Sequence, residues 1–479
     1  MQVQFRTIQD IPVKAYFVSS AALSCAQYPQ AGQALELAER YEAFTGALGQ
    51  IACIRDYQSG SAAVFVGLGD AVTPEALRRG TDRLMVWANR QRVTQLGIAA
   101  GHLREEGLRS VAEAAVMAVY QYTEYLTVQP VHSLEQVVIE TEENLLAAGE
   151  EGAALGQAVN VARDLVNEPS NVQTPLRLAQ EVQALGEAWG FQVAVLEEEQ
   201  IRSLRMEALY QVSKGSPNPP AVIVMRHMGD PDHPENVTGL IGKGVTYDSG
   251  GLNLKSGQRF TTMKHDMAGG GTVIGAMCAI ARQHLPANVV AVVAACENLI
   301  SGTAYKPGDI IGSMGGKTIQ INSTDAEGRL TLIDAITYAL RYEHVSRLID
   351  IATLTGAARR ILGEYGAPVL GNDDALWSAL AAGAEHAGEL VCRVPLVPDA
   401  RAKIRGDVSD LLNTSLAETG GMVTAALFIE EFVEGTPWMH IDAAGPLWLD
   451  HDMPYTPKGG SGWGVRALYH MVKVLCAKA

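Results

Sequence analysis

The chain has 479 residues, of which 47% are hydrophobic and 19% charged, and its formal net charge is −16. This length predicts two domains, with three as the alternative, and the composition is that of a globular protein rather than a disordered one. The negative charge disfavours non-specific binding to nucleic acid or anionic membranes, and the absence of an apolar run of about 18 residues disfavours a membrane span.

The N-terminal segment MQVQFRTIQDIPVKAYFVSS has scattered charges and lacks the continuous apolar region of a signal peptide. The six cysteines lie far apart and form no CxxC pair. This spacing disfavours a zinc–thiolate site or a redox dithiol, and it favours small buried thiols in a reducing environment. We therefore expect a cytoplasmic protein.

The first third of the chain alternates strand-like and helix-like stretches. AAVFVGLG (62–69) is typical of a strand that ends in a glycine turn. Apolar residues recur at intervals of three and four in TPEALRRGTDRLMVWANRQ (73–91) and in SVAEAAVMAVYQYTEYL (110–126), which predicts two helices. Thr73 followed by Pro74 is a favourable start for the first helix.

An alanine-rich stretch from about Glu142 to Val166 predicts a long helix. It ends near NEPSNVQTP (167–175), whose two prolines and two asparagines indicate a loop. We expect an N-terminal α/β domain over 1–150, then a linker helix and loop over 151–175. A second domain would cover 176–479.

The second domain alternates strands and helices more strictly. Apolar runs of strand length occur at 220–227, 237–244, 288–298 and 347–356, and helical stretches occur at 270–284 and 328–343. NVVAVVAAC lacks polar alternation, as expected of a strand buried on both faces of a parallel sheet. The predicted fold class is α/β, with a central sheet flanked by helices in each domain and a mainly parallel sheet in the C-terminal one. Active sites of such sheets lie at the carboxyl ends of the strands.

Charged residues follow two of these strands. They are Lys243, Asp248, Lys255 and Asp266 after the run VTGLIG, and Asp325, Glu327 and Arg329 in the segment STDAEGRL. If the second segment is extended, its three charged side chains project from one side. The free N–H groups of the helix that follows would favour anions nearby.

The four carboxylates of these two segments would repel one another unless they are protonated or joined by cations. Two divalent ions would balance their charge, and oxygen ligands suit Mg²⁺, Mn²⁺ and Zn²⁺. Two-metal sites of this kind hydrolyse substrates with an activated water. Taken singly, each charged residue would be a solvated turn, a helix cap or a surface ion pair, and His265 is expected to neighbour the site rather than bind metal. Strand-end placement, charge balance and the glycines of DSGG and MAGGG favour the metal site.

These segments resemble the cytosolic leucyl aminopeptidase family of dinuclear metallopeptidases. The resemblance runs from VNEPSNVQTP through HIDAAGPLW to KGGSGWGVRAL, and it is closest in GKGVTYDSGGLNLK, MKHDM and STDAEGRL. It implies five metal ligands: Asp248 and Glu327 as bridges, Lys243 and Asp266 at one ion, and Asp325 at the other. The ions would be Zn²⁺ or Mn²⁺, with Mg²⁺ or Co²⁺ as alternatives. Lys243 would have to be neutral, and two adjacent dications would lower its pKa.

The resemblance also implies two catalytic residues. Lys255 would hold the oxygen of the tetrahedral species, and Arg329 would anchor a bicarbonate ion that acts as general base. The substrates would be peptides with a free N-terminus, whose amine lies near Asp266. The first side chain would enter an apolar pocket lined by Met263, Thr353, Leu354, Gly356, Ala444 and Leu447. Such a pocket prefers leucine and methionine and discriminates weakly, by about 1–3 kcal/mol per methylene.

Two positions depart from the family pattern. Ser323 stands where asparagine is usual, which could loosen the metal loop through a lost amide hydrogen bond. MAGGG stands where MGGAA is usual, and its additional glycine predicts a more mobile turn. Neither change removes a predicted ligand. The resemblance further implies a homohexamer, with the domain over 1–150 serving assembly or regulation and the domain over 176–479 catalytic. A membrane is not expected as a partner, because a long apolar run is missing.

Other functions fit the residues less well. DSG (248–250) matches the aspartic-protease triplet, but a second triplet is missing. GSMGGKT lacks the first glycine of a phosphate loop, because that position is Ile311. No HExxH or GxSxG motif occurs. A DNA-binding or scaffold role is the remaining alternative, and the charge of −16 makes nucleic acid an unfavourable partner.

Overall fold

The computed structural model describes residues 1–21, 23, 29–415 and 419–477. These residues form two compact units, one of Met1–Asn160 with His451–Lys458 and the other of Val161–Asp450 with Gly459–Ala479. Nothing local in the sequence marks residues 451–458 as part of the first unit. The domain boundaries at 150 and 175 stay predictions.

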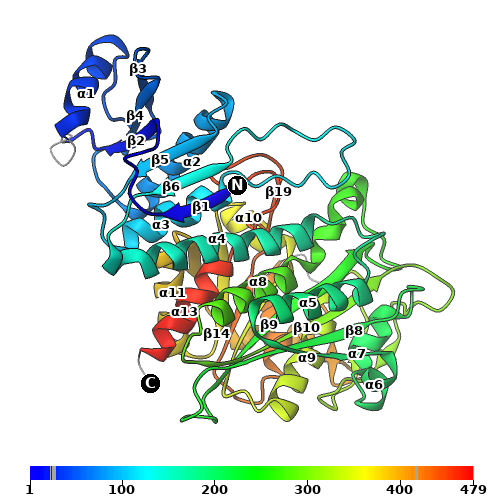
Figure 1. The fold of residues 1–479 in the computed structure, drawn as a ribbon. Coiled ribbons are helices and arrows are strands. Elements are labelled where there is room, and N and C mark those ends of the chain that lie inside the picture. Colours follow the sequence, from blue (N-terminus) through cyan, green and yellow to red (C-terminus); the bar gives the residue numbers. More distant parts are fainter. Residues whose placement is uncertain (22, 24–28, 416–418, 478–479) are drawn as a thin grey trace. The chain divides into compact units, whose positions relative to one another are not determined.

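The first unit holds a six-stranded sheet in the order β1-β6-β5-β2-β4-β3 (Figure 1). The β3–β4 pair is antiparallel and the other four pairs are parallel. The strands are β1 (Gln2–Phe5), β2 (Val13–Val18), β3 (Ile51–Asp56), β4 (Ser61–Gly67), β5 (Gln95–Ala99) and β6 (Gln136–Ile139). The flanking helices are α1 (Pro29–Tyr41), α2 (Pro74–Arg90) and α3 (Glu105–Met117). This is the α/β unit predicted for the N-terminal part.

Helix α2 confirms its predicted start, whereas α3 corrects the predicted helix over 110–126. Thr73 caps α2 by accepting a hydrogen bond from the Ala76 N–H, with proline in the first turn. Helix α3 begins earlier than predicted and ends at Met117. Tyr125 and Leu126 are 58% and 53% exposed, so a longer helix would bury no apolar face there, and packing of such a face is what stabilises most helices.

The long helix is confirmed as α4 (Leu146–Asn167), preceded by a 3₁₀ turn, η1 (Glu143–Leu145). It ends at the predicted loop, and α5 (Pro175–Trp189) begins after the Thr174 cap. No described helix is both long and apolar enough to cross a membrane. The five described cysteines are free; Cys25 lies outside the described residues.

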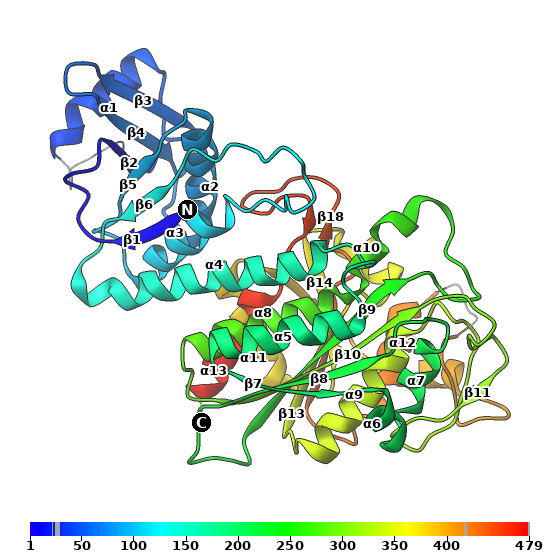
Figure 2. The same ribbon diagram turned by 45° about the vertical axis from the view of Figure 1, so that its right-hand side comes forward.

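The second unit holds an eight-stranded sheet in the order β15-β14-β17-β13-β9-β10-β8-β7 (Figure 2). The central pairs β17–β13, β13–β9 and β9–β10 are parallel, as is β14–β15, while the other three pairs are antiparallel. The strands are β7 (Gln192–Leu196), β8 (Ala221–Met228), β9 (Val237–Asp248), β10 (Asn288–Asn298), β13 (Arg347–Ala352), β14 (Gly366–Gly371), β15 (Leu390–Arg393) and β17 (Trp438–Asp442). All of β10 is buried, as its unbroken apolar run predicts.

Helices cover both faces of this sheet (Figures 1 and 2). Helices α5, α8, α11 and α13 pack with one another on one face, and α7, α9 and α12 pack on the other. Their bounds, with those of the two short helices, are α6 (Glu198–Ser203), α7 (Glu207–Ser213), α8 (Ala268–Arg282), α9 (Gly328–Tyr342), α10 (Gly356–Leu362), α11 (Asp374–Ala387), α12 (Gly421–Glu430) and α13 (Val465–Cys476).

Shorter elements complete the second unit. They are the 3₁₀ helices η2 (Gly257–Met267) and η3 (Pro398–Ile404) and the small strands β11 (Ile310–Ile311), β12 (Ile319–Gln320), β16 (Leu411–Leu412), β18 (Trp448–Leu449) and β19 (Gly459–Gly460). Helix α8 begins directly after η2, and α9 begins directly after the segment STDAE. Both helices therefore start beside the carboxyl ends of the central strands.

Candidate functional site

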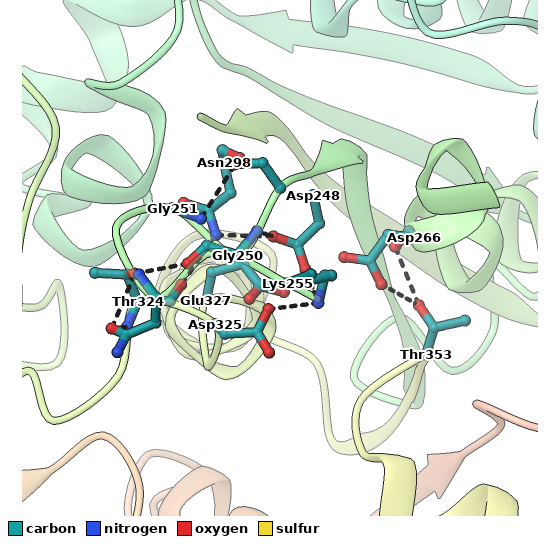
Figure 3. A network of polar contacts seen from close by, with 12 residues as sticks. Asp248, Gly250, Gly251, Lys255, Asp266, Asn298, Thr324, Asp325, Glu327 and Thr353 are labelled. Carbon is teal, nitrogen blue, oxygen red and sulfur yellow. Dashed lines mark hydrogen bonds and ion pairs between the residues drawn. The ribbon is translucent and has the colours of Figure 1, made fainter. Parts of the chain in front are cut away.

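The four predicted carboxylates and Lys255 meet at the carboxyl ends of β9 and β13 in the second unit (Figure 3). Asp248 is the last residue of β9, and Thr353 follows β13 directly. Asp266 lies at the end of η2, and Glu327 precedes the first residue of α9. Segments that are up to about a hundred residues apart in the chain thus converge, as the parallel-sheet argument predicts.

A β-bulge in β9 brings Lys243 and Asp248 to the same side of the sheet. These residues are five apart, and in a regular strand they would face opposite sides. Their partners on β10, Ala294 and Asn298, are four apart, because the register skips Thr246 between Val245 and Tyr247. The additional residue in β9 therefore turns both side chains toward the same face of the sheet. Bulges beside active sites commonly re-aim a side chain in this way.

Two lysines divide the four carboxylates between them. Lys243 Nζ lies 2.7 Å from Asp266 Oδ2 and 2.8 Å from Glu327 Oε1. Lys255 Nζ lies 2.6 Å from Asp248 Oδ2 and 2.5 Å from Asp325 Oδ1. The carboxylates of Asp248, Asp325 and Glu327 each offer an oxygen within 4.8 Å of the others.

The four carboxylates of the site outnumber the two lysines that contact them, so part of their negative charge is not balanced. Burial raises the pKa of Asp248, and Glu327 and Asp266 raise it further; burial also raises the pKa of Asp325 to about 6. Burial alone would lower the pKa of Lys243 and Lys255, but the carboxylates outweigh it and raise both pKa values. A site with this surplus of buried negative charge favours cations.

The residues fit divalent metal ions. Glu327 Oε2 is buried and has no hydrogen-bond partner among the described residues, although a buried carboxylate oxygen normally has one. Asp248, Asp325 and Glu327 supply clustered oxygen ligands of the kind that Mn²⁺, Mg²⁺ and Zn²⁺ accept. Lys243 Nζ lies beside Glu327 and would become a ligand in its neutral form.

The segment STDAEGRL is a turn rather than the extended strand we considered. The Asp325 N–H donates to Ser323 Oγ at 3.2 Å, and Glu327 has helical dihedral angles (φ −75°, ψ −36°). The hydroxyl of Ser323 closes the turn, which is the local bonding that serine favours. Asp325 and Glu327 converge because the turn leads into α9, not because they alternate along a strand.

Arg329 is buried in the first turn of α9 and lies apart from the lysine–carboxylate contacts. Its Nη1 donates to the Asn413 carbonyl at 2.9 Å, and its Nε has no hydrogen-bond partner in the described part of the chain. Burial lowers the pKa of Arg329 to about 10. The guanidinium therefore keeps at least one N–H donor, at Nε, without a partner among the described residues.

The predicted pocket residues occupy different positions. Thr353 Oγ1 donates to Asp266 Oδ1 at 2.8 Å, and its carbonyl accepts from Lys243 Nζ at 3.2 Å. Leu354 follows it and packs against the hydrophobic core of the second unit, and Gly356 begins α10 with open space at its Cβ position. The role of Met263, Ala444 and Leu447 stays a prediction.

Two sequence expectations near the site have structural outcomes. His265 is buried, its Nδ1 contacts the Thr262 carbonyl and its ring lies 5.2 Å from that of Trp448; that it neighbours the metal site without binding metal stays a prediction. The glycines of MAGGG, in contrast, do not form a mobile turn. They are buried in α8, and a Cβ at Gly269 would lie 2.2 Å from the Ile351 carbonyl. They permit close packing of helix on strand.

Several polar residues of the site were missed by sequence reasoning. Asn298 donates to Asp248, Tyr305 and Asn413 donate to carbonyls of the turn, and Thr324 of the turn donates to the Gly250 carbonyl. A signal existed for Asn298, because it ends the buried run NVVAVVAACEN at the same sheet edge as Asp248. For Tyr305 and Asn413 the signal is missing, since their loops carry no periodic pattern.

Two family models match the chain. The N-terminal domain of the cytosol aminopeptidase family matches residues 18–129, and the catalytic domain of that family matches residues 160–469. The chain belongs to the cytosol aminopeptidase family. It is therefore a hydrolase, an aminopeptidase of the metalloprotease type, and the resemblance of the motifs is confirmed.

Curated relatives and solved structures agree with this family. A "Probable cytosol aminopeptidase" of Clostridium perfringens is 40% identical over 460 residues, which cover 92% of each chain. One of Aquifex aeolicus is 39% identical and covers 86% of this chain and 84% of its own. The bottromycin maturation enzyme BotP in complex with Mn superposes with a TM-score of 0.87 at 32% identity, covering 97% of this chain and 99% of its own. A mutant of tomato leucine aminopeptidase gives 0.88 at 30% identity, covering 98% and 96%.

Proposed function

We propose that this aminopeptidase releases N-terminal residues, preferably leucine and methionine, from peptides with a water activated between two divalent ions. The observation that carries the proposal is the cluster of Asp248, Asp325 and Glu327 carboxylates within 4.8 Å. The family of the chain and the Mn-bound relative support the ions, which would be Zn²⁺ or Mn²⁺, with Mg²⁺ or Co²⁺ as alternatives.

Five residues would hold the ions. Asp248 and Glu327 would bridge them, Lys243 and Asp266 would bind one, and Asp325 the other. Bound dications would supply Lewis acidity and lower the pKa of a water toward neutrality. Lys243 would release its contacts with Asp266 and Glu327 and bind in its neutral form.

Lys255 and Arg329 would act on the substrate and the water. Lys255 Nζ lies between Asp248 and Asp325 and would hold the oxygen that becomes negative in the tetrahedral species. Arg329, with its unpartnered Nε among the described residues, would anchor a bicarbonate that takes the proton of the water.

The substrate would be recognised at its N-terminus. Its free amine would lie near Asp266, and its first side chain would enter the pocket of Met263, Thr353, Leu354, Gly356, Ala444 and Leu447. The hydrogen bond from Thr353 Oγ1 to Asp266 Oδ1 supports this proposal, because a residue of the proposed pocket contacts the residue proposed to lie near the amine. We further propose a cytoplasmic homohexamer, in line with the naming of its relatives as cytosol aminopeptidases; nucleic acid is not expected as a partner.

Hydrolysis of Leu-p-nitroanilide tests the proposal. The purified protein is stripped with a chelator and reloaded with Mn²⁺ or Zn²⁺, with Glu327→Ala treated in parallel. We expect activity to return with metal in the wild type and to stay absent in the variant. A folded wild type that stays inactive with every metal would contradict the proposal, and p-nitroanilides of other residues would separate a wrong substrate preference from a wrong mechanism.

A further inference from the structure

Asn298 lies at the centre of the polar network that supports the carboxylates. It is the last residue of β10 and is fully buried. It pairs in register with Asp248, the last residue of β9. Its Nδ2 donates to Asp248 Oδ1 at 2.8 Å and to the Thr324 carbonyl at 2.9 Å (Figure 3).

The orientation of the Asn298 amide follows from its neighbours. Asp248 Oδ1 and the Thr324 carbonyl are both acceptors, so the NH₂ group must face them and the amide oxygen must face away. That oxygen has no hydrogen-bond partner within the described residues. The side chain therefore directs both N–H groups of Nδ2 to acceptors of the site and leaves its own Oδ1 without a partner among the described residues. A side chain with a purely structural role would seldom do this.

The two donors on Asp248 leave a single oxygen for cations. Oδ1 accepts from the Gly250 N–H at 2.8 Å as well as from Asn298. Oδ2 lies 2.6 Å from Lys255 Nζ and faces the other carboxylates. The amide thus fixes both the rotation of the Asp248 carboxylate and the oxygen that it presents.

The second hydrogen bond of Asn298 reaches the turn that carries Asp325. The Thr324 carbonyl accepts from Tyr305 Oη as well as from Asn298, and Thr324 Oγ1 donates to the Gly250 carbonyl. Asp325 follows Thr324 directly. One side chain on β10 thereby holds the end of β9 and the turn before α9 at a set separation.

We propose that Asn298 is a positioning residue that fixes the spacing and orientation of Asp248 and Asp325, so that metal affinity depends on it. The inference rests on the two-metal function proposed above. Groups that bond to metal ligands orient them, and their loss typically weakens metal binding or activity about 10–100-fold.

The sequence offers a matched control at the opposite end of the same strand. Asn288 begins β10, is buried, and donates through Nδ2 to the carbonyls of Asp230 at 2.8 Å and His233 at 2.9 Å. It donates the same number of hydrogen bonds, but it lies at the amino end of the strand, and its Oδ1 also accepts from the Asp230 N–H at 3.0 Å. Asn288→Leu breaks one hydrogen bond more than Asn298→Leu, so a loss of metal binding confined to Asn298→Leu would not be explained by lost stability.

The test is Mn²⁺ affinity, measured by calorimetry and by the electron paramagnetic resonance of free Mn²⁺. We expect Asn298→Leu to weaken Mn²⁺ binding about 10–100-fold and Asn288→Leu to leave it within about threefold of the wild type. Asn298→Asp, which keeps the shape but loses the donors, should be at least as weak as Asn298→Leu. Wild-type affinity in Asn298→Leu, or equal weakening in Asn288→Leu, would overturn the inference.

Two further measurements separate the possible failures. If Asn298→Leu does not fold, Asn298→Ser keeps one donor with less strain and should show an intermediate affinity; wild-type affinity in it would overturn the inference. A folded wild type that binds no Mn²⁺ would defeat the two-metal function itself, whereas a wild type that binds while Asn298→Leu and Asn298→Asp bind equally well would defeat the role of Asn298 alone.

Discussion

Two buried carboxylates, one within helix α9 and one directly before it, are held in opposite ways. Asp334, in the middle of the helix, accepts hydrogen bonds from the backbone N–H groups of Leu209 at 3.0 Å and Met314 at 2.9 Å. Glu327, at the start of the helix, has Lys243 as its near cation, and its Oε2 lacks a hydrogen-bond partner among the described residues. Both side chains are almost completely buried.

The difference separates a carboxylate that supports the fold from one that is available to a ligand. Each carboxylate oxygen of Asp334 accepts a hydrogen bond from a neutral backbone N–H group, and these bonds link α7 and the loop after β11 to α9. Burial would raise the pKa of Glu327, but the nearby charges of Lys243 and Lys255 outweigh it and lower that pKa to about 2, so the carboxylate is ionised while its Oε2 has no hydrogen-bond partner among the described residues. A buried acid with unsatisfied capacity is a better candidate for metal binding than a satisfied one.

The largest expected effect is the loss of catalysis in Glu327→Gln. A neutral amide is a poor ligand for two dications, so the variant should lose the metal site. The Lewis acidity of the ions stabilises the transition state by several kcal/mol, and activity on Leu-p-nitroanilide should therefore fall by about 10³-fold or more. The apo-protein should lose less stability than it does on Asp334→Ala, because Lys243 keeps Asp266 as a partner. Retained activity would remove Glu327 from the metal site.

Asp334→Ala should show the reverse pattern. It strands two buried N–H groups, which costs about 2–4 kcal/mol of unfolding free energy. Urea unfolding of the apo-protein measures this loss, and Mn²⁺ titration of the folded variant should give the wild-type affinity. A weakened Mn²⁺ affinity with unchanged stability would show that Asp334 serves the metal site rather than the fold.

A smaller effect is a pH dependence that Asp334→Asn removes. Burial raises the pKa of Asp334 to about 7, whereas an unfolded aspartate titrates near about 3.9. Between these values the native state holds a proton that the unfolded state has released, so this group lowers stability as pH rises from about 4 to about 7. The stability of Asp334→Asn relative to the wild type should therefore increase over that range, as urea unfolding at pH 5 and pH 8 would show; a constant difference would exclude the raised pKa.

Ser323→Asn should have the smallest effect. The serine hydroxyl closes the turn before Glu327 through the Asp325 N–H, and an asparagine side chain forms the same type of local bond. We expect Mn²⁺ affinity and kcat/KM on Leu-p-nitroanilide to stay within about threefold of the wild type. A tenfold gain in affinity would show that the hydroxyl holds the turn less well than the amide that the family pattern has there.

The sequence predicts the site where local pattern decides the structure. The unbroken apolar run over 288–298 and the periodic stretch over 328–343 identify β10 and α9, and the rule for parallel strand ends then brings Asp248 and Glu327 together. The turn at Ser323, the bond of Asn298 and the end of α3 were not predicted. The turn rests on a local hydrogen bond from the Asp325 N–H to Ser323 Oγ, which the assumption of an extended segment overlooked. The bond of Asn298 and the end of α3 depend on a distant partner, or on the absence of one, which a local pattern does not contain.

The bulge at Thr246 has a consequence for how this chain tolerates insertions and deletions. The skipped register makes the count of residues between Lys243 and Asp248 as important as their identity. Removing Thr246 would give a regular strand with every other contact of the sheet retained, yet it would turn either the amine or the carboxylate away from the site. Substitutions of Thr246 should be tolerated far better than its deletion. The number of residues between Lys243 and Asp248 is therefore a more stringent marker of a functional site than the identity of residue 246.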